Sequence, residues 1–198
     1  MKTKILTLIT AALLFTLSSN SQGWEPYNFS GDEKYEFEIT YYDNNDVTTG
    51  YYGIEMKSTG DTDENGEKLY EVTYTNKGLI PESELGEQTA FGFWSSYGMS
   101  LSFVFLNPMY AMLFQQMEFE VGEKMSFFGA GKAEITGKES IAGRNGYVCK
   151  YFQKDEEKGD VLIGEWVIDP ELAFPLKSIM YDDDEVQSKI ELTNYSRY

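Results

Sequence analysis

Apolar and polar residues alternate with period two along several stretches of this chain, and that alternation restricts the fold more than any other feature. Residues 35–41 read Tyr-Glu-Phe-Glu-Ile-Thr-Tyr, and residues 50–57 and 69–75 repeat the pattern. Successive side chains of a strand point to opposite faces of a sheet, so this pattern is typical of strands with one buried face. Aromatic and β-branched residues, which strands favour, dominate all three stretches. A sheet protein is therefore predicted.

The second half of the chain contains more stretches of this kind, separated by turn residues. Residues 143–146 (Gly-Arg-Asn-Gly) and 155–159 (Asp-Glu-Glu-Lys-Gly) have the composition of hairpin loops. The strands expected around them cover residues 133–136, 147–152, 161–168, 176–181 and 190–195. The predicted fold class is mainly β, with a single antiparallel sheet of about eight to ten strands and one short helical insertion.

Residues 1–21 have the pattern of an export signal. Lys2 and Lys4 give a positive start, residues 5–17 are apolar, and Ser19-Asn20-Ser21 forms a small-x-small cleavage site. The apolar run is shorter than the about 20 residues that a membrane-spanning helix needs. We therefore expect cleavage near Ser21, a single domain over residues 22–198, and a periplasmic or extracellular location. No Cys lies near this site to carry a lipid anchor.

Charge and residue usage exclude several function classes. The net charge is −17, and such a field repels nucleic acid and anionic lipid headgroups. The chain has no His, which excludes the usual zinc sites and the Ser-His-Asp and Cys-His nucleophiles. Cys149 is the single Cys and is expected to be a buried, inert thiol. No pair of carboxylates is distinguished as a glycosidase site, so neither an enzyme nor a cofactor is predicted.

Two acidic segments raise the question of cation binding. Residues 61–66 (Asp-Thr-Asp-Glu-Asn-Gly) resemble the first half of a calcium loop, but Val72 occupies the twelfth position, where a bidentate Glu is required. The alternative is a solvated hairpin loop that ends in the Asn-Gly turn dipeptide. Residues 182–185 (Asp-Asp-Asp-Glu) are interpreted as a charged loop. No metal site is therefore assigned, and calcium at residues 61–65 stays open.

Residues 88–117 contain no Asp, Glu, Lys or Arg and are rich in Phe, Tyr and Met. Asn107-Pro108 within this segment is typical of a helix start, with Asn as N-cap and Pro at the first helical position. So much apolar surface is expected to be buried in a core, a partner, a lipid or a ligand. The candidate ligand-binding residues are Phe91, Phe93, Trp94, Phe103, Phe105, Met109, Met112 and Leu113. Trp166, by contrast, alternates with Gly164 and Ile168 and is interpreted as core.

Several short motifs together resemble the secreted bacterial family known as domain of unknown function 3108. Residues 29–37 and 50–54 resemble the first two strands of that family, and residues 120–123 (Glu-Val-Gly-Glu) resemble the step before its later strands. Residues 137–150 and 165–177 resemble its two hairpins, and residues 190–195 its last strand. The resemblance implies a strongly curved half-barrel, similar to that of the periplasmic lipoprotein carriers, which hold acyl chains between a concave sheet and a helical lid. It implies no catalytic residues.

Two function hypotheses follow from the sequence. In the first, a non-enzymatic exported protein binds a lipid, another apolar small molecule or a lipidated partner between the sheet and a lid formed by residues 88–117. In the second, the same segment fills the core or docks on another envelope protein, and the chain is a structural or interaction module. Neither hypothesis involves nucleic acid or a stable integral membrane protein.

Overall fold

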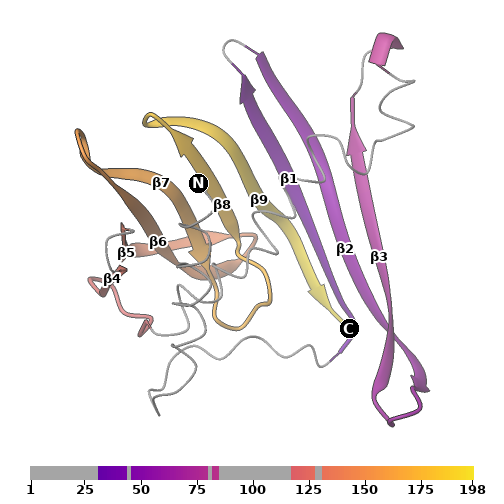
Figure 1. Cartoon of the computed structure of the whole chain (residues 1–198). Coiled ribbons are helices and arrows are strands. Elements are labelled where there is room, and N and C mark those ends of the chain that lie inside the picture. The colour runs from indigo at the N-terminus through magenta and orange to yellow at the C-terminus, as the bar shows by residue number, and fades with distance from the viewer. Residues whose placement is uncertain (1–30, 44–45, 80–81, 85–116, 128–130) are drawn as a thin grey trace, which may run out of the picture.

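The computed structural model describes residues 31–43, 46–79, 82–84, 117–127 and 131–198. Within these ranges, nine strands form one antiparallel sheet in the order β3-β2-β1-β9-β8-β7-β6-β5-β4 (Figure 1). The strands are β1 (Glu33–Asp43), β2 (Asp46–Thr62), β3 (Lys68–Gly78), β4 (Lys124–Phe127), β5 (Gly131–Ile141), β6 (Arg144–Asp155), β7 (Gly159–Ile168), β8 (Lys177–Asp182) and β9 (Glu185–Arg197). A single 3-10 turn, η2 (Glu82–Glu84), is the described helical element.

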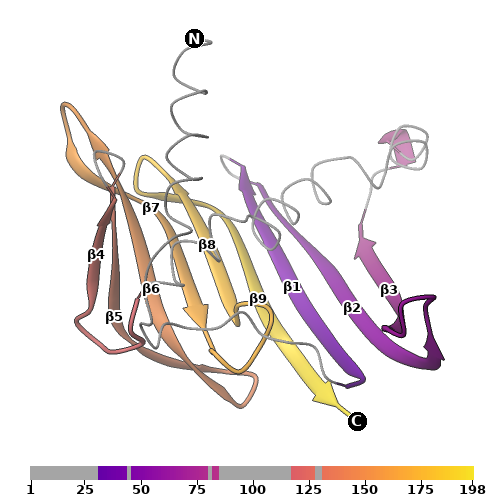
Figure 2. The same cartoon turned by 60° about the horizontal axis from the view of Figure 1, so that its bottom comes forward.

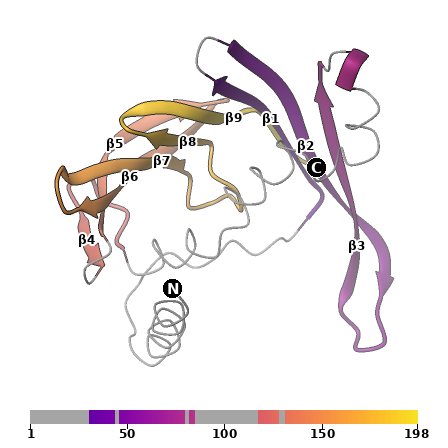
Figure 3. The same cartoon turned by 45° about the horizontal axis from the view of Figure 1, so that its top comes forward.

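The sheet is open and curved. Its strands follow an arc from β4 at one end to β3 at the other, and the loop between β7 and β8 lies on the concave side (Figures 2 and 3). The prediction of a mainly β half-barrel of eight to ten antiparallel strands is therefore confirmed. All eight stretches expected as strands are strands, and the four-residue β4 is an addition that the sequence pattern did not reveal.

Strand β9 joins the two halves of the sheet. It pairs with β8 on one side and with β1 on the other, where Phe37 lies opposite Leu192 and Ile39 opposite Ile190. A bulge interrupts the β1–β9 register, and the Thr193 hydroxyl there donates a hydrogen bond to the Glu36 carbonyl oxygen at 3.0 Å. The remaining pairings join neighbours along the chain, so the topology is a meander closed by this one long-range contact.

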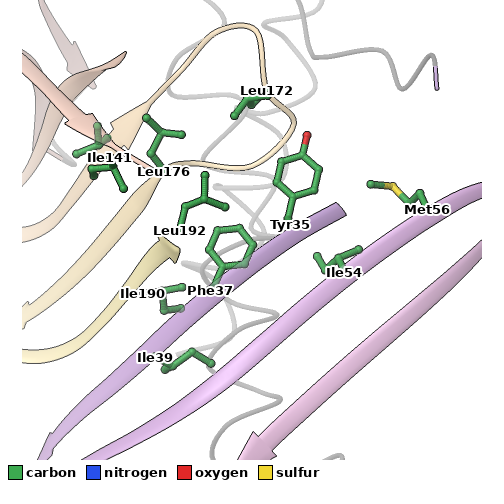
Figure 4. Close-up of a cluster of buried hydrophobic side chains, with 11 residues drawn as sticks. Tyr35, Phe37, Ile39, Ile54, Met56, Ile141, Leu172, Leu176, Ile190 and Leu192 are labelled. Carbon is green, nitrogen blue, oxygen red and sulfur yellow. The ribbon is translucent and has the colours of Figure 1, made fainter. Parts of the chain in front are cut away.

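The main core lies on the concave face. Phe37 and Tyr35 of β1 are fully buried, and the Tyr35 ring meets Phe174 of the β7–β8 loop edge-on, with 5.1 Å between the ring centroids. Figure 4 shows Tyr35, Phe37 and Leu192 beside Leu172 and Leu176 of that loop. Its buried members are Tyr35, Phe37, Ile39, Ile54, Met56, Ile141, Val167, Leu172, Leu176, Ile190 and Leu192. Val167 lies opposite Lys177, so it joins the cluster from the other side of β7. The loop thus closes one part of the concavity with its own apolar residues.

The convex face is covered with charge pairs, because the residues between the core positions of each strand are mostly acidic or basic. Ion pairs join Lys34–Glu36, Lys57–Glu55, Lys124–Glu134, Lys150–Glu165, Lys177–Glu139 and Lys189–Glu191. Lys34, together with hydrogen bonds from Tyr51 and Asn194, lowers the pKa of Glu36 to about 2. Of these pairs, the exposed ones such as Lys57–Glu55 add little stability. Their consequence is a sheet with one charged and one apolar face.

Two hairpin turns hold non-glycine residues in the left-handed region. Between β5 and β6 the turn is formed by Ala142 (φ 49°) and Gly143 (φ 76°), and between β8 and β9 by Asp183 (φ 48°) and Asp184 (φ 66°). The predicted loop at residues 143–146 was therefore wrong in position, because β6 already begins at Arg144. The hairpin predicted at residues 155–159 is confirmed.

Replacing Ala142 with Asn is expected to stabilise the protein by about 1 kcal/mol, because Asn tolerates the left-handed region and Asn-Gly is the favoured type I′ pair. Urea unfolding of A142N should show a higher midpoint at unchanged slope. Ser140→Asn, an exposed strand position two residues earlier, is the control and should not stabilise. An A142N midpoint at or below that of the wild type would contradict the argument from backbone strain.

Candidate functional site

A continuous row of side chains crosses the concave face from β1 to β5. Directly opposed residues of neighbouring strands point to the same face. The register places Ile39, Ile190, Ser178, Trp166, Cys149 and Ile135 side by side in six adjacent strands. All six are buried. The centre of the concave face is thus apolar apart from one hydroxyl and one thiol.

The last residue of the uncharged segment, Met117, is anchored in this face. Its side chain is fully buried and belongs to a second cluster that includes Ile135, Cys149 and Trp166. Two residues later, the half-buried Phe119 meets Tyr147 of β6 with 5.3 Å between the ring centroids. The chain that leaves the uncharged segment therefore packs against the concave side of β5, β6 and β7.

Toward the β3 end of the arc, the apolar surface of the concave face is partly exposed to solvent. Ile54 and Met56 of β2 are buried, and their partners on β3 are Tyr74 and Val72, which are 58% and 42% exposed. The Tyr74 ring stacks on Tyr52 with 6.5 Å between centroids. Direct opposition puts all of these side chains on the concave face. These five residues (Tyr52, Ile54, Met56, Val72 and Tyr74), the β2–β3 strip hereafter, extend the apolar face from the buried core to the exposed Val72 and Tyr74.

Charged groups of the concave face lie at its margins. Glu33, at the start of β1, is fully buried and accepts a hydrogen bond from the Tyr35 hydroxyl at 2.8 Å, with the Arg197 guanidinium 3.9 Å away. Burial raises the pKa of the Tyr35 hydroxyl, which keeps it protonated and donating. Lys138 lies over the Tyr147 ring, 4.4 Å from its centroid. Charge thus occurs on this face near strand ends, away from the central row.

Cys149 is buried, as predicted, and it lies between Ile135 and Trp166 in the row on the concave face. Burial raises the pKa of its thiol. A protonated thiol is a poor nucleophile, and the side chain behaves as a small apolar residue. The geometry gives Cys149 a role in packing.

Ser178 is the unusual member of the row. It is 2% exposed, and its hydroxyl makes no hydrogen bond to any residue that the structure describes. Its cross-strand neighbours are Trp166 and Ile190. Burial of an unsatisfied hydroxyl costs about 1–3 kcal/mol. The Ser178 hydroxyl, at the floor of the concave face, is therefore not expected to stabilise the fold.

Ser178→Ala is therefore expected to raise the free energy of unfolding by about 1 kcal/mol, since it removes an unsatisfied polar atom with little change in volume. Chemical denaturation measures the effect. Ser126→Ala, at an exposed position of β4, is the matched control and should be close to neutral. A loss of stability in S178A would show that the hydroxyl has a stabilising partner.

The eight ligand-binding residues predicted from the sequence lie outside the described residues, as does the helix expected at Asn107-Pro108. Trp166 is a core residue, as predicted. Ser178 and the β2–β3 strip are not among the residues predicted from the sequence. The alternation of residues 69–75 contained the signal for the strip, but only the register shows that its apolar side is the exposed continuation of the core.

The acidic loop at residues 61–66 forms a turn held by Asp63. The Asp63 carboxylate accepts hydrogen bonds at 2.8 Å from the backbone N–H groups of Asn65 and Glu67, and these bonds lower its pKa. Gly66 has φ 83° and completes the hairpin. Of the two alternatives, this geometry favours the hairpin loop, and the described residues contain no group of three or more carboxylates placed to hold a metal ion.

The run at residues 182–185 includes the tight turn between β8 and β9. Asp183 pairs with Lys158 of the neighbouring β6–β7 hairpin. This ion pair between hairpins agrees with the interpretation as a charged loop. In the part of the chain that the structure describes, no helix has the length and apolar character needed to cross a bilayer.

Comparisons with known proteins concern the fold. No protein-family model and no curated protein matches the sequence, so membership of the family named above stays a prediction. Similar solved structures include Pseudomonas aeruginosa MucB in complex with MucA, at 12% identity and TM-score 0.38 over 83% of this chain and 51% of that one. A Bacteroides fragilis protein with a YmcC-like fold has 10% identity and TM-score 0.35 over 86% and 98%. A LolA-superfamily protein from Nitrosomonas europaea has 9% identity and TM-score 0.26 over 89% and 90%.

The chain spans about half the length of the MucB structures that it matches. At these identities and TM-scores the similarities carry no functional argument.

Proposed function

We propose that this protein is a non-enzymatic, exported binding protein that holds an apolar ligand, either a lipid or the acyl chain of a lipidated partner, against the concave face of its sheet. Mostly apolar concave sites with few polar groups suit such ligands. In this chain the concave face supplies a buried apolar row and an exposed apolar strip, and the charges lie on the other face or at strand ends.

The observation that carries the proposal is the place of Met117. This residue ends the uncharged segment and is fully buried against Ile135 and Trp166 of the concave face. A segment anchored at that point is tethered to the apolar side of the sheet. Phe119 adds a second contact on the same side. The anchor supports a lid formed by residues 88–117 over the concavity.

We assign the second wall of the site to this lid. Its ligand contacts would be Phe91, Phe93, Trp94, Phe103, Phe105, Met109, Met112 and Leu113. Met side chains adapt to irregular apolar shapes, and aromatic rings supply large contact areas. Trp94→Ala is expected to weaken binding of an apolar ligand, and Trp24→Ala, outside the uncharged segment, is the control.

Native mass spectrometry of protein purified without detergent tests the proposal directly. A ligand-binding protein should carry copurified lipid as a discrete added mass that organic solvent removes. The delipidated protein should then bind N-phenylnaphthylamine, a neutral apolar probe, with a rise in fluorescence. A protein free of added mass that also fails to bind the probe would refute ligand binding.

A charge introduced on the β2–β3 strip should weaken probe binding on the order of tenfold, because an apolar contact is lost and an ammonium group must be desolvated. Val72→Lys makes this change at an exposed concave position. Thr73→Lys adds the same charge one residue along β3, on the convex side opposite Glu55, and should bind normally. Titration of the two delipidated variants with N-phenylnaphthylamine compares them. Equal affinities would exclude the strip from the site.

A second candidate function is favoured by the β7–β8 loop. Its residues Leu172, Phe174 and Leu176 pack on Tyr35 and its neighbours and fill part of the concavity. If the uncharged segment completes this filling, the protein is an envelope interaction module without a ligand. A clean monomer mass together with a specific complex recovered from cells would support that function instead.

A further inference from the structure

Strand β3 forms the longer free end of the sheet. It has 11 residues and pairs with β2, and no second strand lies beside it within the described residues (Figure 2). The opposite end, β4, has four residues. The outer side of an edge strand presents backbone N–H and C=O groups that can pair with another strand. A long free edge therefore offers a surface for strand addition.

The side chains of β3 match this use. Tyr74 and Val72, on the concave side, are 58% and 42% exposed. On the convex side lie Glu71 and Lys77, three residues before and three residues after Tyr74. The strand thus carries an exposed aromatic residue, Tyr74, next to its centre, with the opposite charges of Glu71 and Lys77 at equal distances from it.

We propose that two copies of this chain associate by antiparallel pairing of β3 with β3, about a two-fold axis at Tyr74. In that register the two Tyr74 side chains lie directly opposite each other. Glu71 of each copy lies opposite Lys77 of the other, which gives two symmetric ion pairs. Two-fold dimers are self-complementary in this way, and directly opposed charges of opposite sign stabilise a strand pair.

Charge complementarity selects this register among the two-fold ones. An axis at Glu71 or at Lys77 would place like charges opposite each other. β3 also contains Lys68, but no axis other than the one at Tyr74 places Glu71 opposite Lys77, and an axis at Thr73 or Thr75 leaves these two residues opposite neutral side chains. The axis at Tyr74 satisfies both charges at once. It also keeps the concave faces of the two copies on the same side, because a two-fold axis perpendicular to a sheet does not exchange its faces.

The dimer would join two arcs into one sheet and bring the two β2–β3 strips together. The exposed Tyr74 and Val72 would then line a shared apolar surface. Association is independent of the proposed ligand, since the contacts are backbone groups and residues of β3. Its failure would leave ligand binding untouched.

A charge exchange tests the register. Analytical ultracentrifugation of the purified wild-type protein should show a concentration-dependent dimer. Glu71→Lys turns both ion pairs into Lys–Lys contacts, and Lys77→Glu turns both into Glu–Glu contacts. Each variant alone should dimerise on the order of tenfold more weakly. An equimolar mixture of the two should recover the wild-type affinity, because every contact across the axis is again between opposite charges.

The mixture separates the proposal from simple loss of fold, since two unfolded variants would not restore each other. Glu67→Lys, with the same charge change in the β2–β3 turn, is the control and should dimerise normally. A wild-type protein that stays monomeric at all concentrations would overturn the proposal. So would a dimer whose affinity E71K and K77E leave unchanged, or a mixture no tighter than its components.

Cross-linking provides a second, geometric test. Directly opposed residues of antiparallel strands have Cα atoms about 4.5–5.5 Å apart, within the range of a disulfide. Tyr74→Cys should therefore form a disulfide-linked dimer under mild oxidation, and the one native Cys, Cys149, is buried and does not compete. Val72→Cys is on the same face, but the substituted residues of the two copies would lie on opposite sides of the axis and too far apart for a disulfide. This variant should therefore not cross-link. Equal cross-linking of both variants would contradict this register.

Discussion

Phe37→Ala is expected to lower the free energy of unfolding by about 3–5 kcal/mol. Phe37 is fully buried in the centre of β1, stacks on Tyr35 at 6.3 Å between centroids, and lies opposite Leu192 of β9. Its removal opens a cavity where the two halves of the sheet meet. Because domains of this size are stable by about 5–15 kcal/mol, this loss is a large fraction of the total stability. Urea denaturation followed by tryptophan fluorescence measures the change.

The control is the neighbouring residue. Glu38 is exposed on the convex face, so Glu38→Ala should change stability by less than about 0.5 kcal/mol. The contrast between adjacent positions tests the assignment of the two faces as well as the core. Comparable losses in both variants would mean that the faces are wrongly assigned at β1.

Gly131→Ala is expected to destabilise the protein by about 4 kcal/mol or more. A Cβ atom at this position would lie 2.1 Å from the backbone carbonyl oxygen of Phe152, and Gly131 has φ 150°. The obstacle is backbone of the paired strand β6, so relief requires the strands to separate. Thermal unfolding of G131A should show a large drop in midpoint together with loss of β5–β6 pairing, visible as faster amide exchange.

Gly137 provides a control within the same strand. No atom lies within 4 Å of a Cβ built there, so Gly137→Ala should be neutral or stabilising by about 0.5–1 kcal/mol. If G131A and G137A unfold alike, the close approach of β5 to β6 at Gly131 is not a determinant of stability.

The strands could be predicted because their alternation is strong. Tyr35, Phe37 and Ile39 are buried where the period-two pattern placed them, and Trp166 packs as the alternation with Ile168 indicated. The four residues of β4 are too few for a pattern to establish itself. The β5–β6 turn was misplaced because Gly143 and Gly146 both look like turn residues, whereas the turn uses Ala142 in a conformation that Ala rarely adopts.

The candidate site could be predicted only in part, because it depends on register. Nothing in residues 177–182 indicates that Ser178 lies between Trp166 and Ile190. These three residues belong to β8, β7 and β9, which become neighbours only in the folded sheet. The same holds for Val72 and Tyr74, whose exposure follows from the position of β3 at the edge. The contacts of residues 91–113, from which the sequence predicted the ligand site, lie outside the described residues and stay a proposal.

The position of β9 between β8 and β1 makes assembly of the complete sheet a late step in folding. The bond from Thr193 to the Glu36 carbonyl closes a loop of 157 residues, and neither half of the sheet meets the other without it. Long loop closures slow folding. Strands β1–β3 and β4–β8 therefore cannot join into one sheet before residues 185–197 are available. The complete nine-stranded sheet can therefore form only after that final strand is available.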